Sequence, residues 1–265
     1  ARIGKVVSRS KRARFLRKKA TKAARLYKTN LWPAAKFGVS GQGLAPTAIR
    51  QLRTAAANAA LGAQGQCATT AIRLELGEDA DPEVKARTTV IQDFVWLYAN
   101  VSQEVRGQVD QAWNSLGQKL SGGRRWARVR GPIGAAIATL LDIGWVPDSP
   151  GRWWREDKTE YALQGTPAGR IDEAMIHDIE QDIEEEVFGK AAEHRAGAGM
   201  QRGVDYKVMK KHLAHLEKHK QKGKREILVR CACAAMWPRA RKKEANICGD
   251  GRCQRCGADD EDEYH

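Results

Sequence analysis

The sequence predicts a mainly α-helical protein with a small β hairpin or meander near 145–163 and a short cysteine-rich segment at its C-terminal end. Apolar residues recur at helical spacing along most of the 265-residue chain. Aromatic residues at 145–163 alternate with proline and glycine turns, which is typical of short strands. Hydrophobic residues make up 42% of the chain, enough for a packed core.

The first helix should be strongly cationic, because residues 1–30 hold twelve Lys and Arg and no Asp or Glu. Its start signal lies at Ser8 or Ser10, and Trp32-Pro33 should end it, since the residue before a proline avoids helical geometry. We expect one docked face, formed by a thin apolar stripe of Phe15, Leu16, Ala23 and Leu26, and a cationic outer face.

Further helix signals follow in order. Pro46 opens a helix that closes at Leu61-Gly62, and its alanine-rich face predicts close packing on a neighbouring helix. Asp81-Pro82 begins the next one. Apolar residues at helical spacing over 105–120 and an apolar run over 132–143 predict two more.

The charge reverses after the β element. Residues 171–188 contain eight acidic residues and an apolar residue at every fourth position, which predicts an amphipathic helix with an acidic back. The segment 202–230 is basic, with ten Lys and Arg against three acids. We expect the acidic helix to pair with this basic segment inside the fold, or to screen it when no nucleic acid is bound.

The net charge of +14 favours a polyanionic partner, because each phosphate that a protein neutralises releases counterions. The other reading is a basic protein without a nucleic-acid role. No apolar stretch reaches the ~20 residues that a membrane helix needs, so we expect no membrane partner. The chain has only six cysteines, five of them after residue 230, which indicates a reducing, intracellular location, the nucleus or the cytoplasm.

Two clusters are candidates for contact with nucleic acid. The cations of the first helix suit phosphate contacts, which fix position without reading sequence: Arg9, Lys11, Arg12, Arg14, Arg17, Lys18 and Lys19. The second cluster surrounds an aromatic ring and suits base stacking with phosphate pairing: Arg124, Arg125, Trp126 and Arg128. The competing reading of the second cluster is a buried tryptophan in a solvated basic turn.

The C-terminal segment has metal-ligand spacing. Cys253 and Cys256 form a Cys-x2-Cys pair, and His265 follows after eight residues. We expect a structural zinc site whose fourth ligand is Cys248 or a residue beyond the segment; the alternative is unrelated cysteines in a polar tail. Because the chain begins at an alanine and stops on a candidate ligand, we expect it to be a fragment of a longer protein.

A row of histidines and a second pair of cysteines give weaker signals for a metal site. Three histidines share one helix face, where we prefer a wet basic face to a ligand row: His212, His215 and His219. Cys231-x-Cys233 is a weak metal signal. The sequence has no His-Glu-x-x-His, Walker loop, Gly-x-Ser-x-Gly or nucleotide fingerprint. We therefore assign no catalytic residue.

Three further segments carry a recognisable pattern: residues 11–14 (Lys-Arg-Ala-Arg), 26–38 (Leu-Tyr-Lys-Thr-Asn-Leu-Trp-Pro-Ala-Ala-Lys-Phe-Gly) and 44–53 (Leu-Ala-Pro-Thr-Ala-Ile-Arg-Gln-Leu-Arg). Together they resemble the region after the catalytic palm in non-LTR (LINE-type) retrotransposon reverse transcriptases. The family often shows a basic helix, a Leu-Tyr-x5-Pro-Ala-x2-Tyr-Gly segment and a Leu-x2-Leu-Arg helix there. Many members then end in a Cys-x2-Cys-x8-His-x4-Cys zinc knuckle. Phe37 replaces the usual tyrosine, and Cys248 is not part of the pattern.

The resemblance implies a thumb and linker that grip template RNA or an RNA–DNA hybrid, with the polymerase aspartates upstream. The parent would be an RNA-directed DNA polymerase, with or without an endonuclease, and the rest of its polyprotein would be a partner. We divide the chain into a thumb-like region (1–62), a helical linker (63–145), a β element with acidic and basic helices (146–245) and an incomplete knuckle (246–265).

Two other function classes stay open. One is a stand-alone basic, zinc-containing RNA-binding or ribosome-associated protein. The other is an enzyme with a dispersed site, which buried carboxylates converging on a pocket with His177 or His194 would favour.

Overall fold

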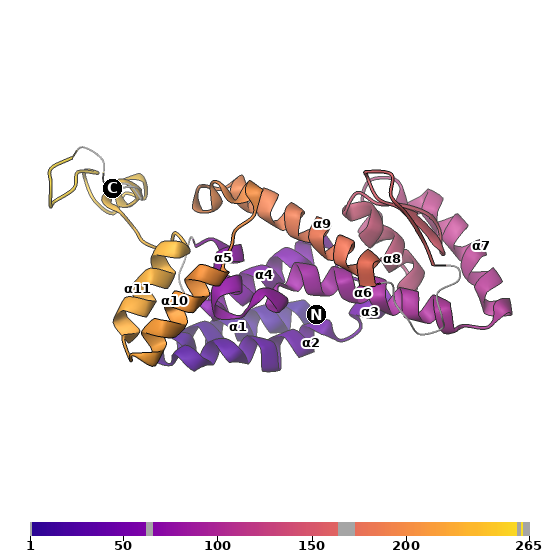
Figure 1. Ribbon diagram of the computed structural model, residues 1–265, viewed down its shortest axis with the longest axis horizontal. Helices are drawn as coiled ribbons and strands as arrows, with labels where there is room; N and C mark the ends of the chain where they lie inside the picture. Colours follow the sequence, from indigo (N-terminus) through magenta and orange to yellow (C-terminus); the bar gives the residue numbers. More distant parts are fainter. Residues whose placement is uncertain (1, 62–65, 164–172, 259–260, 262–265) are drawn as a thin grey trace.

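The computed structural model describes residues 2–61, 66–163, 173–258 and 261, and it is mainly helical with one small sheet, as the sequence predicts (Figure 1). The molecule is elongated, with the sheet and helix α7 at one end and the C-terminal segment at the other (Figure 1). Buried hydrophobic side chains form a single connected cluster from Val6 to Ala235. None of the helices in the described ranges is long and apolar enough to cross a bilayer.

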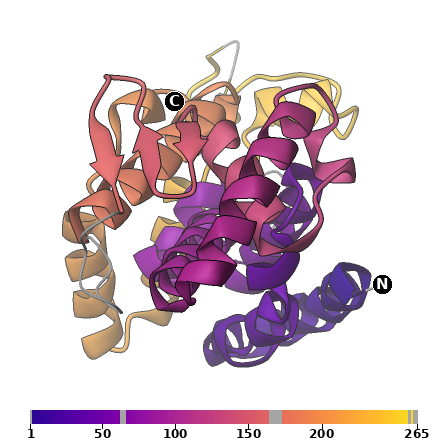
Figure 2. The same cartoon turned by 90° about the vertical axis from the view of Figure 1, so that its right-hand side faces the viewer.

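The N-terminal part holds four helices joined by a 3-10 turn and a short π-helix: α1 (Arg2–Lys19), the turn Thr21–Ala24, the π-helix Tyr27–Leu31, α2 (Trp32–Lys36), α3 (Val39–Gln42) and α4 (Pro46–Ala60). Helix α1 lies along an outer edge of the molecule and packs on α4 (Figure 2). The alanine-rich face of α4 is buried there, which confirms the predicted close packing.

The predicted docking face of α1 was wrong. Phe15 is 63% exposed and Leu16 is 45% exposed, whereas Val6, Ser10 and Ala13 are buried. These three follow each other at intervals of four and three residues, so they form one stripe of a helix. Their small side chains let α1 approach the alanines of α4 closely. The same packing extends the helix back to Arg2, before the predicted start at Ser8 or Ser10.

Proline 33 does not end the helical region, contrary to prediction. It occupies the first turn of α2, where a missing N–H is not needed for the helix. The chain reaches it through the π-helix, whose Tyr27 and Leu31 are buried. Gly38 then takes a left-handed conformation, with φ of 73°, and leads into α3.

Four helices form the middle of the chain: α5 (Ala68–Glu75), α6 (Pro82–Asn100), α7 (Gln103–Leu120) and α8 (Gly131–Asp142). Asp81 caps α6, because its carboxylate accepts the backbone N–H of Glu83 at 2.9 Å. The predicted helices that begin at Pro82 and that follow Gly131 are confirmed. Helix α6 packs on α4 and on α8, and α8 packs on β1.

The β element is an antiparallel meander in the order β1 (Val146–Ser149), β2 (Arg152–Trp154) and β3 (Glu160–Ala162). This confirms the short strands predicted near 145–163. Trp153 in β2 is fully buried, with its ring centroid 6.2 Å from that of Phe94 on α6. Its ring centroid also lies 6.5 Å from that of Trp113 on α7, so aromatic contacts with two helices anchor the sheet to the helical core.

The C-terminal part contains α9 (Glu173–Ala192), α10 (Lys207–Lys218), α11 (Lys222–Ala232) and α12 (Arg239–Glu244). Carboxylates of α9 pair with arginines of α5, α6 and the segment after β2: Glu184 with Arg73, Glu186 with Arg87 and Asp182 with Arg155. The prediction that this helix pairs with the basic segment 202–230 is therefore wrong, because α9 packs on α5 and α6. Two cations of that segment pair elsewhere, Lys210 with Glu78 and Arg225 with Glu75.

Candidate nucleic-acid interface

The outer face of α1 consists of Arg9, Lys11, Arg12, Phe15 and Lys19. All five side chains are exposed, and the four cations have no hydrogen bond or ion pair with any described residue. Lys11 and Lys19 lie one helical turn before and after Phe15, so the ring sits among the cations. Cations suit phosphates and an exposed ring suits stacking on a base.

Three other predicted cations of α1 stand apart from this face. Arg17 is 4% exposed, and its Nε donates to the carbonyl oxygen of Ala60 at 2.8 Å. We therefore remove Arg17 from the predicted phosphate contacts. Arg14 is half-buried, at the edge of the docked side. The side chain of Lys18 lies outside the described parts of the structure.

Arg17 belongs to a cluster centred on Glu75, whose side chain is only 4% exposed. Glu75 pairs with Arg17 at 3.1 Å and with Arg225 at 2.9 Å, so it joins α1, α5 and α11. Arg17 also lies 3.8 Å from Glu226 on α11. The sequence analysis missed Glu75, because a single glutamate at the end of a short helix carries no signal for contacts far along the chain.

The predicted cluster around Trp126 serves mainly the fold. The indole Nε1 donates to Asp142 at 2.7 Å, and Arg125 pairs with the same carboxylate at 3.3 Å. The ring packs so closely over Gly43 that a Cβ there would lie 2.7 Å from it. Burial raises the pKa of Asp142 above its ordinary value, against the opposing effect of the Trp126 hydrogen bond.

The two remaining residues of that cluster are exposed. Arg128 donates to the carbonyl oxygen of Lys119 at 2.9 Å, and Arg124 opens the turn with φ of 57°. They flank the buried ring and do not form a stacking platform with it. The structure thus favours the reading of Trp126 as a partly buried tryptophan in a basic turn.

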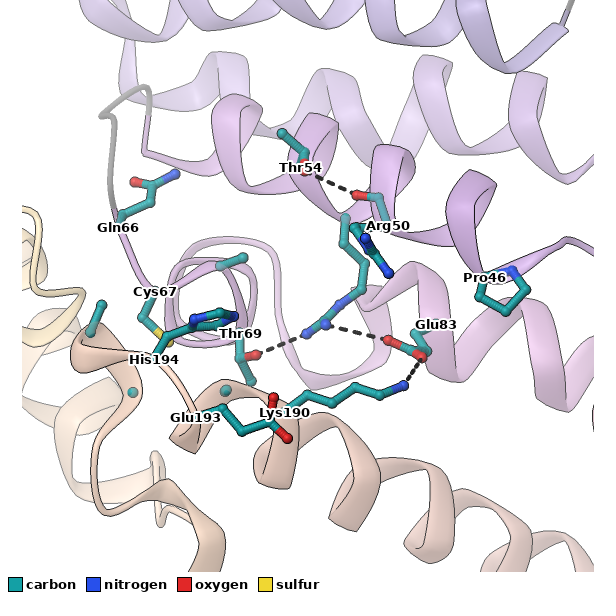
Figure 3. A pocket seen from close by; sticks show the side chains of 15 residues that line it. Pro46, Arg50, Thr54, Gln66, Cys67, Thr69, Glu83, Lys190, Glu193 and His194 are labelled. Atoms are coloured by element: carbon teal, nitrogen blue, oxygen red, sulfur yellow. Dashed lines mark hydrogen bonds and ion pairs between the residues drawn. The ribbon is translucent and has the colours of Figure 1, made fainter. Parts of the chain in front are cut away.

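A cavity of about 640 Å³ lies between α4, the start of α5 and the end of α9 (Figure 3). Arg53, Glu83 and Lys190 line it. They belong to an ion-pair seam, which we define as Arg53, Asp81, Glu83, Arg87, Glu186 and Lys190. Arg53 pairs with Asp81 at 3.1 Å and with Glu83 at 3.3 Å, and it donates to the Thr69 hydroxyl at 2.8 Å.

Glu83 receives cations from three directions. Its side chain is 7% exposed, and Arg87 and Lys190 lie 3.2 and 3.7 Å from it, in addition to Arg53. His194 lines the same cavity, while His177 is on an exposed part of α9. Glu83 therefore joins α4, α6 and α9 through its ion pairs with Arg53, Arg87 and Lys190.

The described part of the cysteine-rich segment forms a tight turn. The N–H of Arg255 donates to Cys253 Sγ at 3.4 Å, and the N–H of Gly257 donates to the Cys253 carbonyl at 2.9 Å. Cys248 is directed to the carbonyl oxygen of Asp250, 3.0 Å from its Sγ. His265 lies outside the described residues. Within those residues, no three His, Cys, Asp or Glu side chains gather into a group that could hold a metal ion.

The sequence analysis also assigned no contact residues to α10 and α11, although it noted their charge. We expected the acidic helix to pair with this segment or to screen it. The carboxylates of that helix, α9, instead form ion pairs with Arg73, Arg87 and Arg155. The three histidines His212, His215 and His219 are exposed on α10, in keeping with a wet basic face.

In comparisons with known proteins, the chain matches no protein-family model, no curated protein and no solved structure.

Proposed function

We propose that this protein binds nucleic acid through the outer face of α1. The single observation that carries the proposal is that Arg9, Lys11, Arg12 and Lys19 are exposed without an acidic partner among the described residues. Neighbouring like charges on a helix repel each other, and a polyanion relieves that repulsion. Contacts to phosphates position the protein without reading sequence.

We further propose that the chain is the thumb and linker region of a retroelement RNA-directed DNA polymerase, where it grips template RNA or an RNA–DNA hybrid. The three segments that carry the resemblance, 11–14, 26–38 and 44–53, support this. They fall on α1, the π-helix with α2, and α4, which pack on one another as a unit. Nucleotide transfer itself belongs, in this proposal, to aspartates outside the chain.

A structural zinc ion is part of the same proposal. Cys253, Cys256 and His265 would supply three ligands, with the fourth from Cys248 or from outside the chain. The turn at 253–257 supports the first of these, because the N–H of Arg255 donated to Cys253 Sγ would stabilise a thiolate. The metal would supply folding free energy to a short polar segment. Titration of the full chain with zinc should show binding that is lost in Cys253→Ser; tight binding retained in that variant contradicts the site.

The main test is a salt series with fluorescently labelled RNA, RNA–DNA hybrid and duplex DNA. Four phosphate contacts at α1 should contribute about −3.6 to the slope of log K against log salt. The variant Lys11→Glu/Lys19→Glu should lower the slope by about 1.8 and the affinity about 60-fold near 0.1 M salt.

The matched control is Lys119→Glu/Lys158→Glu, which makes the same charge change at two exposed lysines on α7 and in the β2–β3 turn. It should bind like the unchanged protein, apart from a small general electrostatic loss. Equal losses in both variants, or an affinity independent of salt, would contradict a contact at α1. A preference for the hybrid over duplex DNA would support the retroelement assignment.

A further inference from the structure

We infer that the α10–α11 hairpin is a second phosphate-binding surface, which grips the same nucleic acid as α1. The surface, called here the lysine ridge, consists of Lys207, Lys211, Lys218, Lys220, Lys222 and Lys224. This inference rests on the proposed function, because it takes the polyanion to be a nucleic acid. It goes beyond that function by assigning contact residues that neither the motifs nor the resemblance indicate.

The fold turns the lysine ridge to solvent. Leu213 and Leu216 are buried on the inner side of α10, and Val229 is buried on α11. Lys207, Lys211 and Lys218 are spaced by four and seven residues, so they form one stripe on the opposite side of α10. All six lysines of the ridge are exposed, including those in the turn that leads into α11.

The ridge is uncompensated because the acids of the hairpin are already engaged. Glu217 pairs with Arg225 at 3.8 Å, and Glu226 pairs with Arg230 at 3.2 Å. Asp205 accepts the backbone N–H of Lys207 at the start of α10. The six ridge lysines, by contrast, have no hydrogen bond or ion pair from their ammonium groups to any residue that the structure describes.

A neighbouring lysine shows the difference. Lys210 lies on the same helix, one residue before Lys211, and its Nζ is 2.6 Å from Glu78. That hydrogen bond holds the pKa of Glu78 below its ordinary value, so Lys210 is matched within the fold. Lys211 is exposed and pairs with no acid in the part of the chain that the structure describes. Charge that the fold leaves unmatched in this way is available to an external polyanion.

The hairpin is fixed next to the C-terminal end of α1. Arg17 on α1 lies 3.8 Å from Glu226 on α11, and Glu75 binds both Arg17 and Arg225. These buried contacts hold the lysine ridge at a set distance from Lys19, the last cation of the outer face. In this proposal, a nucleic acid that lies on α1 and extends past its C-terminal end reaches the ridge. The pairing of two cationic surfaces across a fixed spacing favours a long nucleic acid over a short one.

The test compares Lys211→Gln/Lys218→Gln with the control Lys85→Gln/Lys210→Gln, in which both lysines are paired with acids, Asp79 and Glu78. Binding of the full chain is measured by fluorescence anisotropy on a labelled RNA–DNA hybrid of about thirty base pairs, across about 50–200 mM salt. The ridge variant should lose about 1.8 from the salt slope, while the control keeps the slope of the unchanged protein.

The outcomes separate the two proposals. If Lys11→Glu/Lys19→Glu weakens binding while the ridge variant binds like its control, the lysine ridge is overturned and the α1 interface stands. If the unchanged protein binds the hybrid weakly and without salt dependence, the nucleic-acid function itself fails. Binding to phosphatidylserine vesicles but not to the hybrid would also overturn the ridge as a nucleic-acid surface. Thermal unfolding of each variant confirms that it is folded.

Discussion

The outer face of α1 and the ion-pair seam use the same kind of side chain for opposite purposes. On α1, Arg12 is exposed and has no partner among the described residues, whereas in the seam Arg87 is 3% exposed and lies between Glu83 and Glu186. What differs is where the acids lie. The count of basic residues therefore says little about function until the position of each carboxylate is known.

The two regions should also differ in what they contribute. Removing one partner of a buried ion pair leaves an uncompensated charge and costs about 3–5 kcal/mol, whereas exposed pairs and charges contribute about 0–1 kcal/mol. Mutations in the seam should therefore lower stability and mutations on the outer face of α1 should lower affinity. The following predictions test this separation.

The largest effect is expected for Glu83→Ala. Arg53 and Arg87 would each lose a buried partner, so the free energy of unfolding should fall by about 3–5 kcal/mol. Glu193→Ala is the matched control, because Glu193 lines the same cavity but is exposed. Urea unfolding measures both. A change below about 1 kcal/mol in Glu83→Ala would mean that the seam does not hold the helices together.

A comparison within one helix comes next. Arg17→Met should destabilise the protein by about 2–3 kcal/mol, less than a full pair loss because Glu75 keeps Arg225. Arg12→Met should change stability by less than about 0.5 kcal/mol but reduce the salt slope of binding by about 0.9. Urea unfolding measures the stability of both variants, and fluorescence anisotropy measures the salt slope of their binding. Similar stability losses would show that burial does not separate the two arginines.

Phe15 tests whether the outer face of α1 uses its aromatic ring. Stacking on an unpaired base is worth about 1–3 kcal/mol, so Phe15→Ala should weaken binding to single-stranded RNA by that amount without loss of stability. Phe37→Ala is the control, because Phe37 is 79% exposed and lies outside the cationic face. Equal affinities of the two variants would leave only phosphate contacts at α1.

The smallest effect concerns pH. Burial alone would raise the pKa of Glu186, but the charge of Arg87 and hydrogen bonds from Lys190 and Arg87 lower it below its ordinary value of 4.5. This contribution to stability is complete above pH 4.5 and is lost as the pH falls through the lowered pKa. Unfolding of the protein and of Glu186→Gln should therefore differ at neutral pH and converge in acid. A constant difference would contradict the ion pair.

Parts of the fold follow from local signals in the sequence. Pro46 and Asp81-Pro82 mark helix starts that the structure confirms, because a proline in the first turn and an aspartate cap act within a few residues. The meander follows from turns and aromatic residues in the same way. The exposure of Arg9, Lys11, Arg12 and Lys19 on a cationic helix face was also expected from the pattern.

Other parts could not be predicted from the pattern. Phe15 and Leu16 satisfy the rule for a docked stripe, yet the smaller Val6 and Ala13 are the ones that pack on α4. The acidic helix was expected on the basic segment because of their net charges, and net charge is a weak guide when individual arginines of α5 and α6 offer buried partners.

The sequence by itself determined the helix starts at Pro46 and Pro82, where the strands turn, and that the chain carries a large excess of positive charge. Only the tertiary structure decided which of these charges are matched inside and which face the solvent. The physical reason is range: caps and turns act over a few residues, whereas Arg17 meets Glu226 and Arg87 meets Glu186 only after the chain has folded. The balance of charge at each position is thus a property of the packed molecule.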